Sequence, residues 1–471
     1  MAGLAAQNSA EHTASEPAAA PPAGIVAERV AALNELALSW RQKAVPATAH
    51  GLRVGDFVRS EPTLATFQTP LLTLDGAALT ANLDRMAQWC SDKGVLIAPH
   101  GKTTMAPQLW KEQLDRGAWG ITLANASQLR VAHAFGVRRV MIANTLSDPQ
   151  AITWLASVQG PEFRVVSWVD SLRTVELLSE TLTGTSVDTA ATAPVLDVIV
   201  ELGGAGGRTG ARSAAEALEV ARAVAQSPVL QLVGIGGYEG ALAHTADPAG
   251  IAAVRGYLET VRDTHRQFLV EELYAPEADI IVTAGGSAYF DDVVDVLAPC
   301  LHASAGETDD GGTSLGASGQ RVDVIIRSGA YLVHDDGFYR GISPFSRAGG
   351  QPFQSAMHAW ARVVSQPEPG LAILDAGKRD VPVDEGLPEP QLLGTYLGGP
   401  MSELLDASIS SVNDQHCFLR FDPAKTSVNI GDVVRLGLSH PCTAFDKWTL
   451  IPVLADTHSD SRVVDLIHTF F

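Results

Sequence analysis

Apolar, β-rich runs recur through the middle of the chain, and stretches with helical spacing separate them. The eight runs are residues 94–102, 120–125, 138–145, 163–171, 195–203, 230–240, 279–287 and 323–331. Near-continuous apolar runs that alternate with helices are typical of parallel strands buried on both faces of a sheet. Eight such units over about 250 residues predict an α/β fold built on a (β/α)8 TIM barrel. An open doubly wound sheet is the structural alternative.

The pattern changes on both sides of this region, which predicts more than one domain. Residues 1–23 are rich in Ala, Pro, Glu and Ser, and we expect a disordered tail. Residues 24–65 begin with helical spacing, and we expect this helix and its connector to pack on a C-terminal β domain. Residues 66–331 form the expected barrel, in which 301–320 is a Gly/Ser/Asp-rich surface insertion. Residues 332–471 hold strand-like pieces between Pro/Gly turns, which predicts a second, mostly β domain.

Charge and cysteine content narrow the classes of partner. Lys and Arg total 33 and Asp and Glu total 53, so the formal net charge is −20. An acidic surface argues against nucleic acid and anionic membrane as partners. The four cysteines are far apart, without CxxC spacing, which favours reduced thiols and a cytoplasmic protein. No apolar stretch approaches the roughly 18 to 20 residues that a membrane span needs.

A barrel places its active residues directly after the strands, and Lys102 follows the first strand in the string APHGKTTMAP. Burial at the mouth of a barrel lowers the pKa of a lysine. The neutral amine can then attack an aldehyde and form a Schiff base. An isolated lysine would be interpreted as a solvated loop residue. The neighbouring His100, and Gly101 with its unusual backbone freedom, favour the interpretation that Lys102 lies in the active site.

Two glycine-rich turns follow other strands. The seventh strand ends in TAGGS, where Gly285, Gly286 and Ser287 offer backbone N–H groups and a hydroxyl to an anion. Phosphate sites of barrels often lie in the loops after the seventh and eighth strands. The fifth strand leads into ELGGAGGRTGAR, which places Arg208 near the pocket mouth. Arg208 could pair with a phenolate, a phosphate or a substrate carboxylate, or it could be a surface arginine on a flexible loop.

The C-terminal domain contains the string SHPCTAFDKW, in which His440 and Cys442 are two positions apart. In an extended segment, these side chains point to the same face. An imidazole and a thiolate on one face suit zinc, and two protein ligands leave open positions, as in a catalytic metal site. A buried structural cysteine beside a histidine is the alternative. His416 and Cys417 form a second candidate pair.

Taken together, these motifs resemble fold-type III pyridoxal 5′-phosphate (PLP) enzymes, which have an alanine racemase-like barrel. The His-x-Cys pair is similar to the branch of D-serine dehydratases (deaminases) and D-threonine aldolases, and the resemblance covers roughly residues 66–460. It implies that Lys102 is the catalytic residue and forms the imine with PLP. The implied cofactor-binding residues are Lys102, Arg208, Tyr238, Gly285, Gly286, Ser287 and Tyr331. The implied metal ligands are His440 and Cys442, with Zn²⁺ as the metal and Mn²⁺ as the alternative.

The resemblance implies a dehydratase that converts D-serine or a related 3-hydroxy-D-amino acid to a 2-oxo acid and ammonia. Cys442 favours this reaction, because related aldolases tend to carry aspartate at that position. The alternative is a D-threonine aldolase, which releases glycine and an aldehyde. Two further alternatives are a PLP-carrying protein without turnover and a sugar-phosphate enzyme that uses Lys102 without a cofactor. The expected partner is a small D-amino acid, and fold analogy implies a homodimer.

Overall fold

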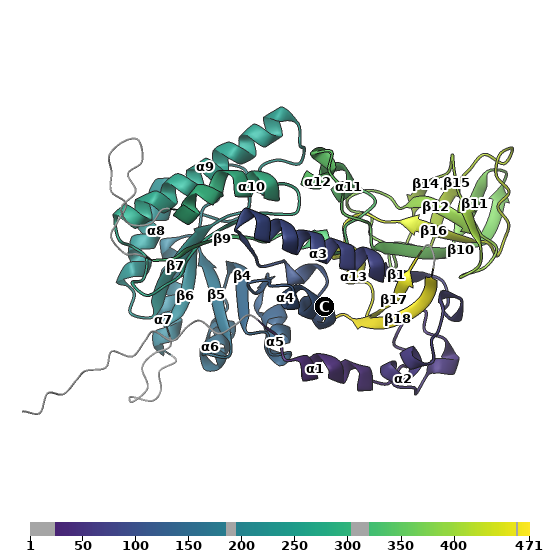
Figure 1. Ribbon diagram of the computed structural model, residues 1–471, viewed down its shortest axis with the longest axis horizontal. Helices are drawn as coiled ribbons and strands as arrows, with labels where there is room; N and C mark the ends of the chain where they lie inside the picture. The colour runs from purple at the N-terminus through teal and green to yellow at the C-terminus, as the bar shows by residue number, and fades with distance from the viewer. Residues whose placement is uncertain (1–23, 185–194, 303–319, 458–459) are drawn as a thin grey trace, which may run out of the picture.

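The computed structural model describes residues 24–184, 195–302, 320–457 and 460–471, and it contains two sheets (Figure 1). The expected tail 1–23 and all but the ends of the expected insertion 301–320 lie outside the described residues. A parallel sheet with its helices forms one half of the molecule, and a mostly antiparallel sheet forms the other. None of the described helices is long and apolar enough to cross a membrane.

The predicted barrel is confirmed. Its eight parallel strands are β2 (Leu96–Ile97), β3 (Ile121–Leu123), β4 (Arg139–Thr145), β5 (Arg164–Val169), β6 (Leu196–Glu201), β7 (Leu230–Gly236), β8 (Ile280–Ala284) and β9 (Val322–Ile326). They pair in chain order from β3 to β9, and β9 pairs with β2. Trp119 N donates to Ile97 O at 2.8 Å and Thr122 N donates to Pro99 O at 2.9 Å, which joins β2 to β3 and closes the ring.

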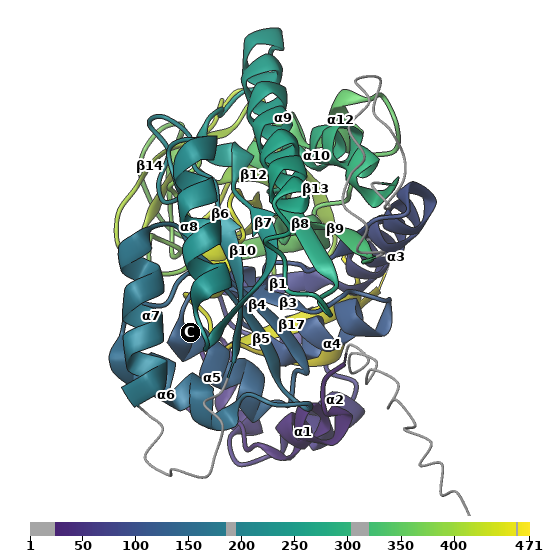
Figure 2. The same cartoon turned by 90° about the vertical axis from the view of Figure 1, so that its left-hand side faces the viewer.

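The barrel is filled from inside and covered from outside. Alternate strand positions point inward, because successive side chains of a strand face opposite ways. Val166, Ile199 and Ile325 therefore lie in one interior cluster, whereas Val165 and Val324 lie in the main core beneath the helices. The covering helices are α3 (Gly76–Lys93), α4 (Pro107–Asp115), α5 (Ala126–Ala134), α6 (Pro149–Val158), α7 (Leu172–Gly184), α8 (Ala214–Gln226), α9 (Pro248–Val270) and α10 (Phe290–Leu297), several of which ring the strands in Figure 2.

Local sequence signals start and stop these helices. Asp75 accepts from Ala78 N and caps the start of α3, and Gly94 ends the helix with a left-handed φ of 66°. Asp148 caps α6 directly before a proline at its first position, and Ser213 caps α8. Each cap satisfies a backbone N–H group that the first turn of a helix leaves without an internal partner.

The second domain is mostly β, as predicted. Its central sheet has the order β13 (Met401–Glu403), β12 (Glu389–Gly394), β16 (Val433–Gly437), β10 (Met357–Glu368), β1 (Leu71–Asp75), β17 (Leu450–Asp456) and β18 (Asp460–His468). The strands β11 (Leu371–Leu374), β14 (Ser408–Val412) and β15 (Cys417–Arg420) branch from β10. Residues 71–75 thus belong to this sheet, whereas the predicted barrel domain 66–331 included them. A short apolar run reveals that it is a strand but not which sheet it joins.

The N-terminal segment contacts both halves. α1 (Ala27–Ala31) lies beside the barrel, where Val26 N donates to Phe135 O at 3.1 Å. The connector after it buries Leu38, Phe57 and Phe67 in a core shared with Trp360 and Leu454 of the β domain. The C-terminus also returns to the barrel, because Phe470 N donates to Met105 O at 2.9 Å (Figure 1).

Candidate active site

A cavity of about 640 Å³ opens at the carboxyl ends of the barrel strands, between the barrel and the β domain. Cavities of this size hold cofactors and small substrates. Lys102, Arg208, Tyr238, Gly286, Ser287, His440 and Cys442 all line it, although they come from five separate stretches of sequence. The cavity therefore brings together most of the residues that the sequence singled out.

Lys102 lies in a short 3-10 turn, Gly101–Thr103, directly after β2. The turn packs tightly, because a Cβ added at Gly101 would lie 2.5 Å from Ile121 Cγ2 and 2.7 Å from Trp110 Nε1. His100 precedes the turn, and burial lowers its pKa well below the usual value, with the charges of Lys102, Arg327 and Arg208 adding to the effect. His100 is therefore neutral beside the lysine.

The loop after β6 and the end of β7 bring an arginine onto an aromatic ring. The Arg208 guanidinium lies 4.6 Å from the centre of the Tyr238 ring, which is cation–π contact. Burial raises the pKa of Tyr238 to about 12, and the neighbouring Glu239 carboxylate adds to the rise. Tyr238 therefore stays a neutral phenol that can donate a hydrogen bond into the cavity.

The glycine turn after β8 differs from the expected phosphate cradle. Gly285 N donates to Glu239 Oε2 at 2.8 Å and Gly286 N donates to Glu239 Oε1 at 2.7 Å, and Glu239 is fully buried. The two N–H groups that the sequence assigned to phosphate thus already bind a carboxylate. The left-handed φ of 110° at Gly285 explains the need for glycine there. Ser287 still faces the cavity, and its hydroxyl oxygen accepts from Ala330 N at 3.1 Å.

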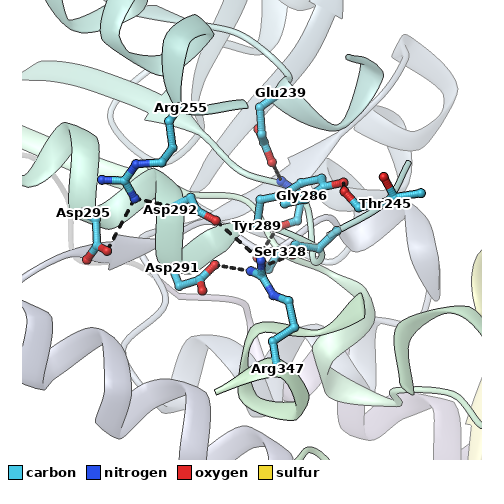
Figure 3. Close-up of polar contacts among 11 residues, drawn as sticks. Glu239, Thr245, Arg255, Gly286, Tyr289, Asp291, Asp292, Asp295, Ser328 and Arg347 are labelled. Atoms are coloured by element: carbon cyan, nitrogen blue, oxygen red, sulfur yellow. Dashed lines mark hydrogen bonds and ion pairs between the residues drawn. The ribbon is translucent and has the colours of Figure 1, made fainter. Parts of the chain in front are cut away.

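Two arginines hold the start of α10 directly behind this turn (Figure 3). Asp292 lies between them, with Arg255 Nη1 at 2.9 Å from Oδ1 and Arg347 Nη1 at 3.6 Å from Oδ2. Arg347 also contacts Asp291 Oδ1 at 2.6 Å, and it comes from α12 (Pro344–Arg347) in the link between the two domains. The arginines offset two acidic charges that would otherwise repel an anion at the turn.

The candidate metal pair, His440 and Cys442, lines the cavity next to the turn that carries Lys102. Cys442 Sγ lies 3.5 Å from Thr103 Oγ1, the residue after Lys102. Burial raises the pKa of Cys442, but its hydrogen bonds with His440 and Thr103 and the nearby charges of His440 and Lys102 outweigh burial, and the pKa is lowered overall. Asp384 Oδ2 hydrogen bonds to His440 Nδ1, which leaves the other ring nitrogen for a ligand. Among the described residues, no group of three or more His, Cys, Asp and Glu side chains forms a closed metal site.

His440 itself is held by the barrel side. Its backbone N donates to Asp335 Oδ2 at 2.9 Å, and the residue adopts a left-handed φ of 58°. Burial raises the pKa of Asp335 to about 6. A carboxylate from the end of the barrel thus fixes the backbone that presents the candidate metal pair.

Several residues that line the cavity were not among the predicted site residues. Arg327 follows β9 directly and is only 1% exposed; its guanidinium lies 4.7 Å from the centre of the Trp168 ring. Thr283 Oγ1 and Gly237 O accept from its Nη atoms at 2.6 and 2.5 Å. A charged residue after an apolar strand was a visible signal for Arg327. Phe338 and Tyr339 also line the cavity, but they come from the domain link, where no pattern pointed to them.

Four polar atoms of the cavity lining have no hydrogen-bond partner in the described part of the chain. They are His100 Nδ1, Trp168 Nε1, Glu201 Oε2 and Arg327 Nε. Buried polar atoms normally have partners, and those without one are often completed by a ligand or water. Donors and acceptors around a lysine in a cavity of this size fit a polar aromatic cofactor such as PLP.

The assignment of Tyr331 to the cofactor is corrected by the structure. Tyr331 does not line the cavity; it is 4% exposed and lies in the main core, where its hydroxyl accepts from Gln113 Nε2 at 3.1 Å. It stands five positions after the end of β9, in the turn Ala330–Leu332, which directs the ring away from the strand ends. Gly329 and Ala330 face the cavity instead.

The chain is similar to several known proteins. Residues 356–454 match the family model described as "Putative serine dehydratase domain". The chain is 25% identical to a D-threonine aldolase of Arthrobacter sp. over 83% of this chain and 90% of that protein. It is 26% identical to a 3-hydroxy-D-aspartate aldolase of Paracoccus denitrificans over 72% of this chain and 80% of that protein.

Solved structures show the same fold. The D-threonine aldolase of Filomicrobium marinum superposes with a TM-score of 0.69 and 22% identity, covering 87% of this chain and 97% of that one. The D-threo-3-hydroxyaspartate dehydratase of Delftia sp. HT23 superposes with a TM-score of 0.66 and 18% identity, covering 87% and 99%. Alanine variants of a cysteine and of a histidine two positions before it are known for a D-threo-3-hydroxyaspartate dehydratase, the cysteine variant in a metal-free form.

The barrel, the cavity that contains Lys102 and the similarity to known proteins together define a fold-type III, alanine racemase-like PLP enzyme. Within that class, the chain is similar to D-threonine aldolase, 3-hydroxy-D-aspartate aldolase and D-threo-3-hydroxyaspartate dehydratase, and this similarity identifies it as a PLP-dependent lyase.

Proposed function

We propose that this lyase is a PLP- and divalent-metal-dependent dehydratase of D-serine or a related 3-hydroxy-D-amino acid, which releases a 2-oxo acid and ammonia. The observation that carries the proposal is that Lys102 lies close to the pair His440 and Cys442 in the cavity. The thiol reaches Thr103 at 3.5 Å, so the amine and the metal pair border the same part of the cavity. They can therefore act on two adjacent carbons of one small substrate.

The cofactor, when bound, supplies an electron sink for the α-carbon, and the metal supplies Lewis acidity at the β-hydroxyl. The residues of the chain do the rest. Lys102 takes the α-proton, and the buried, neutral His100 beside it does not compete as a charged acid. Arg208 and the neutral phenol of Tyr238 orient the polar edge of the cofactor. Ser287 is the hydroxyl donor that remains for the phosphate after Glu239 has taken the glycine N–H groups.

The donor set of the metal pair supports elimination. A cysteine thiolate favours zinc over manganese or magnesium. The dehydratase relative carries a histidine and a cysteine with the same spacing as His440 and Cys442. Asp384 orients the histidine, as a carboxylate does in many zinc sites.

The second candidate is retro-aldol cleavage to glycine and an aldehyde. It is favoured by the similarity to D-threonine aldolase, which extends over 83% of this chain. Both reactions need the same lysine and metal pair. They differ in whether the α-proton or the proton of the β-hydroxyl leaves first.

Product analysis decides between the two reactions. Purified protein with PLP is incubated with D-serine, D-threonine and 3-hydroxy-D-aspartate, each with zinc or manganese. We expect a 2-oxo acid and ammonia, with higher rates in zinc. Glycine and an aldehyde as the main products would overturn the proposal in favour of the aldolase. A Lys102→Ala variant serves as the control and should lose both the imine absorption band and turnover.

A further inference from the structure

The glycine loop between β6 and α8 folds around a side chain that does not line the active cavity. Arg212 Nη1 donates to the carbonyl oxygens of Gly204 and Thr209, both at 3.1 Å. Arg212 Nη2 donates to the carbonyl oxygens of Gly207 at 3.4 Å and Arg208 at 2.5 Å. One guanidinium group thus binds four backbone carbonyls of the loop 204–209, on the side away from the active cavity.

This loop needs such a support. Glycine occupies positions 203, 204, 206, 207 and 210, and glycine loses the most conformational entropy when a chain becomes ordered. Gly206 and Gly210 adopt left-handed φ angles of 75° and 101°. A guanidinium offers five N–H donors in a planar fork, whereas the compact ammonium of a lysine cannot reach several spread carbonyls at once.

Hydrogen bonds also fix the backbone around Arg212. Its backbone N donates to Glu216 Oε2 at 2.7 Å, which ties it to the first turn of α8. The neighbouring Ala211 N donates to Glu201 O at 2.9 Å, beside the end of β6. The guanidinium therefore connects a helix and a strand to the glycine loop, whose other side-chain ties are Thr209 Oγ1 to Glu201 Oε1 at 2.9 Å and Gly210 N to Asp170 Oδ2 at 3.3 Å among the described residues.

The other side of the same loop forms part of the active cavity. Gly206, Gly207, Arg208 and Thr209 line it, and Arg208 lies over the Tyr238 ring at 4.6 Å. The 2.5 Å bond to the Arg208 carbonyl fixes the backbone from which that side chain extends. We propose that Arg212 is a positioning residue that sets the place of Arg208 in the active cavity. The proposal rests on the proposed function only where PLP binding is the readout.

A double-mutant cycle tests this. The variants are Arg212→Lys, Arg208→Ala and both together, and Arg222→Lys is the matched control. Arg222 lies on α8 and pairs with Glu271 at 2.7 Å, away from the loop. We expect Arg212→Lys to weaken PLP binding about tenfold in the parent protein and less than about twofold when Arg208 is already alanine, because coupled residues are not additive. The control should leave PLP binding unchanged.

Amide hydrogen exchange provides a readout that does not depend on the cofactor. In Arg212→Lys, the amides of 203–210 should exchange faster while those of α8 keep their rates, both with and without PLP. Equal weakening of PLP binding in both backgrounds, or unchanged exchange in the loop, would overturn the proposal. If the parent protein binds no PLP, the proposed function fails, and loop exchange alone still decides the role of Arg212.

Discussion

At the residue scale, Cys442 is the side chain on which the proposed choice of elimination over retro-aldol cleavage depends. Its replacement by alanine removes one of two protein ligands from the candidate metal pair, and the remaining imidazole should bind zinc more weakly. We expect Cys442→Ala to lose at least about tenfold in metal affinity and to keep its PLP absorption band. Metal analysis after dialysis and an absorption spectrum measure the two effects.

His416→Ala is the control for this variant. The sequence also suggested His416 and Cys417 as a metal pair, but His416 is exposed on a hairpin turn and Cys417 is buried in β15. The two side chains therefore do not share a face. His416→Ala should keep its full metal content, and metal retained by Cys442→Ala would contradict the assignment of the site.

Tyr331 allows a second test at this scale, because its corrected place is structural. Tyr331→Phe removes one buried hydrogen bond, to Gln113, and leaves an amide donor without its partner. We expect a loss of about 1 to 2 kcal/mol in the free energy of unfolding and no change in PLP affinity. Urea denaturation and a PLP titration are the measurements. Tyr238→Phe, in the cavity, should instead weaken PLP binding and change the free energy of unfolding little. Weaker PLP binding by Tyr331→Phe would restore the original assignment.

The rule that active residues follow barrel strands explains why much of the site was predictable. Lys102, Arg208, Tyr238 and Ser287 all follow strands, and all line the cavity. The rule does not predict the direction in which the side chain of the next residue points. Glu239, next to Tyr238, is fully buried against the glycine turn, and this orientation depends on contacts between strands that one sequence does not show.

At the element scale, the start of α10 depends on an element that is distant in sequence. Arg347 of α12 contacts Asp291 and Asp292 and has a side chain that is 19% exposed. Removing it leaves Asp291 without its cation and leaves the buried Asp292 paired with Arg255 alone, and breaking a buried pair is costly. We expect Arg347→Ala to lower the free energy of unfolding by about 2 to 4 kcal/mol and to weaken PLP binding, because the glycine turn directly precedes α10.

Arg340→Ala is the matched control for that variant. Arg340 pairs with Glu389 at 2.8 Å, but its side chain is 54% exposed, and such surface pairs contribute about 0 to 1 kcal/mol. Denaturation and PLP titration of the two variants are compared with those of the parent protein. Equal losses of stability and of PLP affinity in the two variants would show that burial of the ion pairs of Asp291 and Asp292 does not determine the effect.

The elements themselves were predictable, but their sheet membership was less so. All eight apolar runs became barrel strands, because parallel strands buried on both faces leave a clear pattern. β1 has the same kind of apolar pattern, yet it pairs with β10 and β17. Pairing partners depend on long-range packing, which a short run of residues does not encode.

At the scale of the whole molecule, the active site exists only because the two domains meet. Asp336 N donates to Leu438 O at 2.9 Å, and Asp335 accepts from His440 N, so the end of the barrel and the loop that carries His440 and Cys442 run side by side. Motifs for both halves were visible in the sequence. Their contact was not, because more than 330 positions separate Lys102 from His440 along the chain.

Buried histidines set the pH response of the folded molecule. Burial lowers the pKa of His265 to about 3 and the pKa values of His334 and His468 to about 4. In the unfolded chain a histidine takes up a proton near pH 6.5, so below that pH the unfolded state binds more protons and is favoured. Stability should therefore fall as the pH decreases from about 7 to about 5. Asp335, whose pKa is raised to about 6, acts in the opposite direction and reduces the net fall.

His265→Asn isolates one of these contributions. His265 is fully buried in α9, its Nδ1 lies 2.7 Å from Tyr274 Oη, and the charge of Arg266 adds to the lowering of its pKa. Asparagine has no titrating group, so the fall in the free energy of unfolding between about pH 7 and about pH 5 should be smaller by about 2 kcal/mol than in the parent protein. Urea denaturation at both pH values gives this difference, and all other titrating groups cancel in the comparison. An equal fall in the two proteins would show that folding does not lower the pKa of His265.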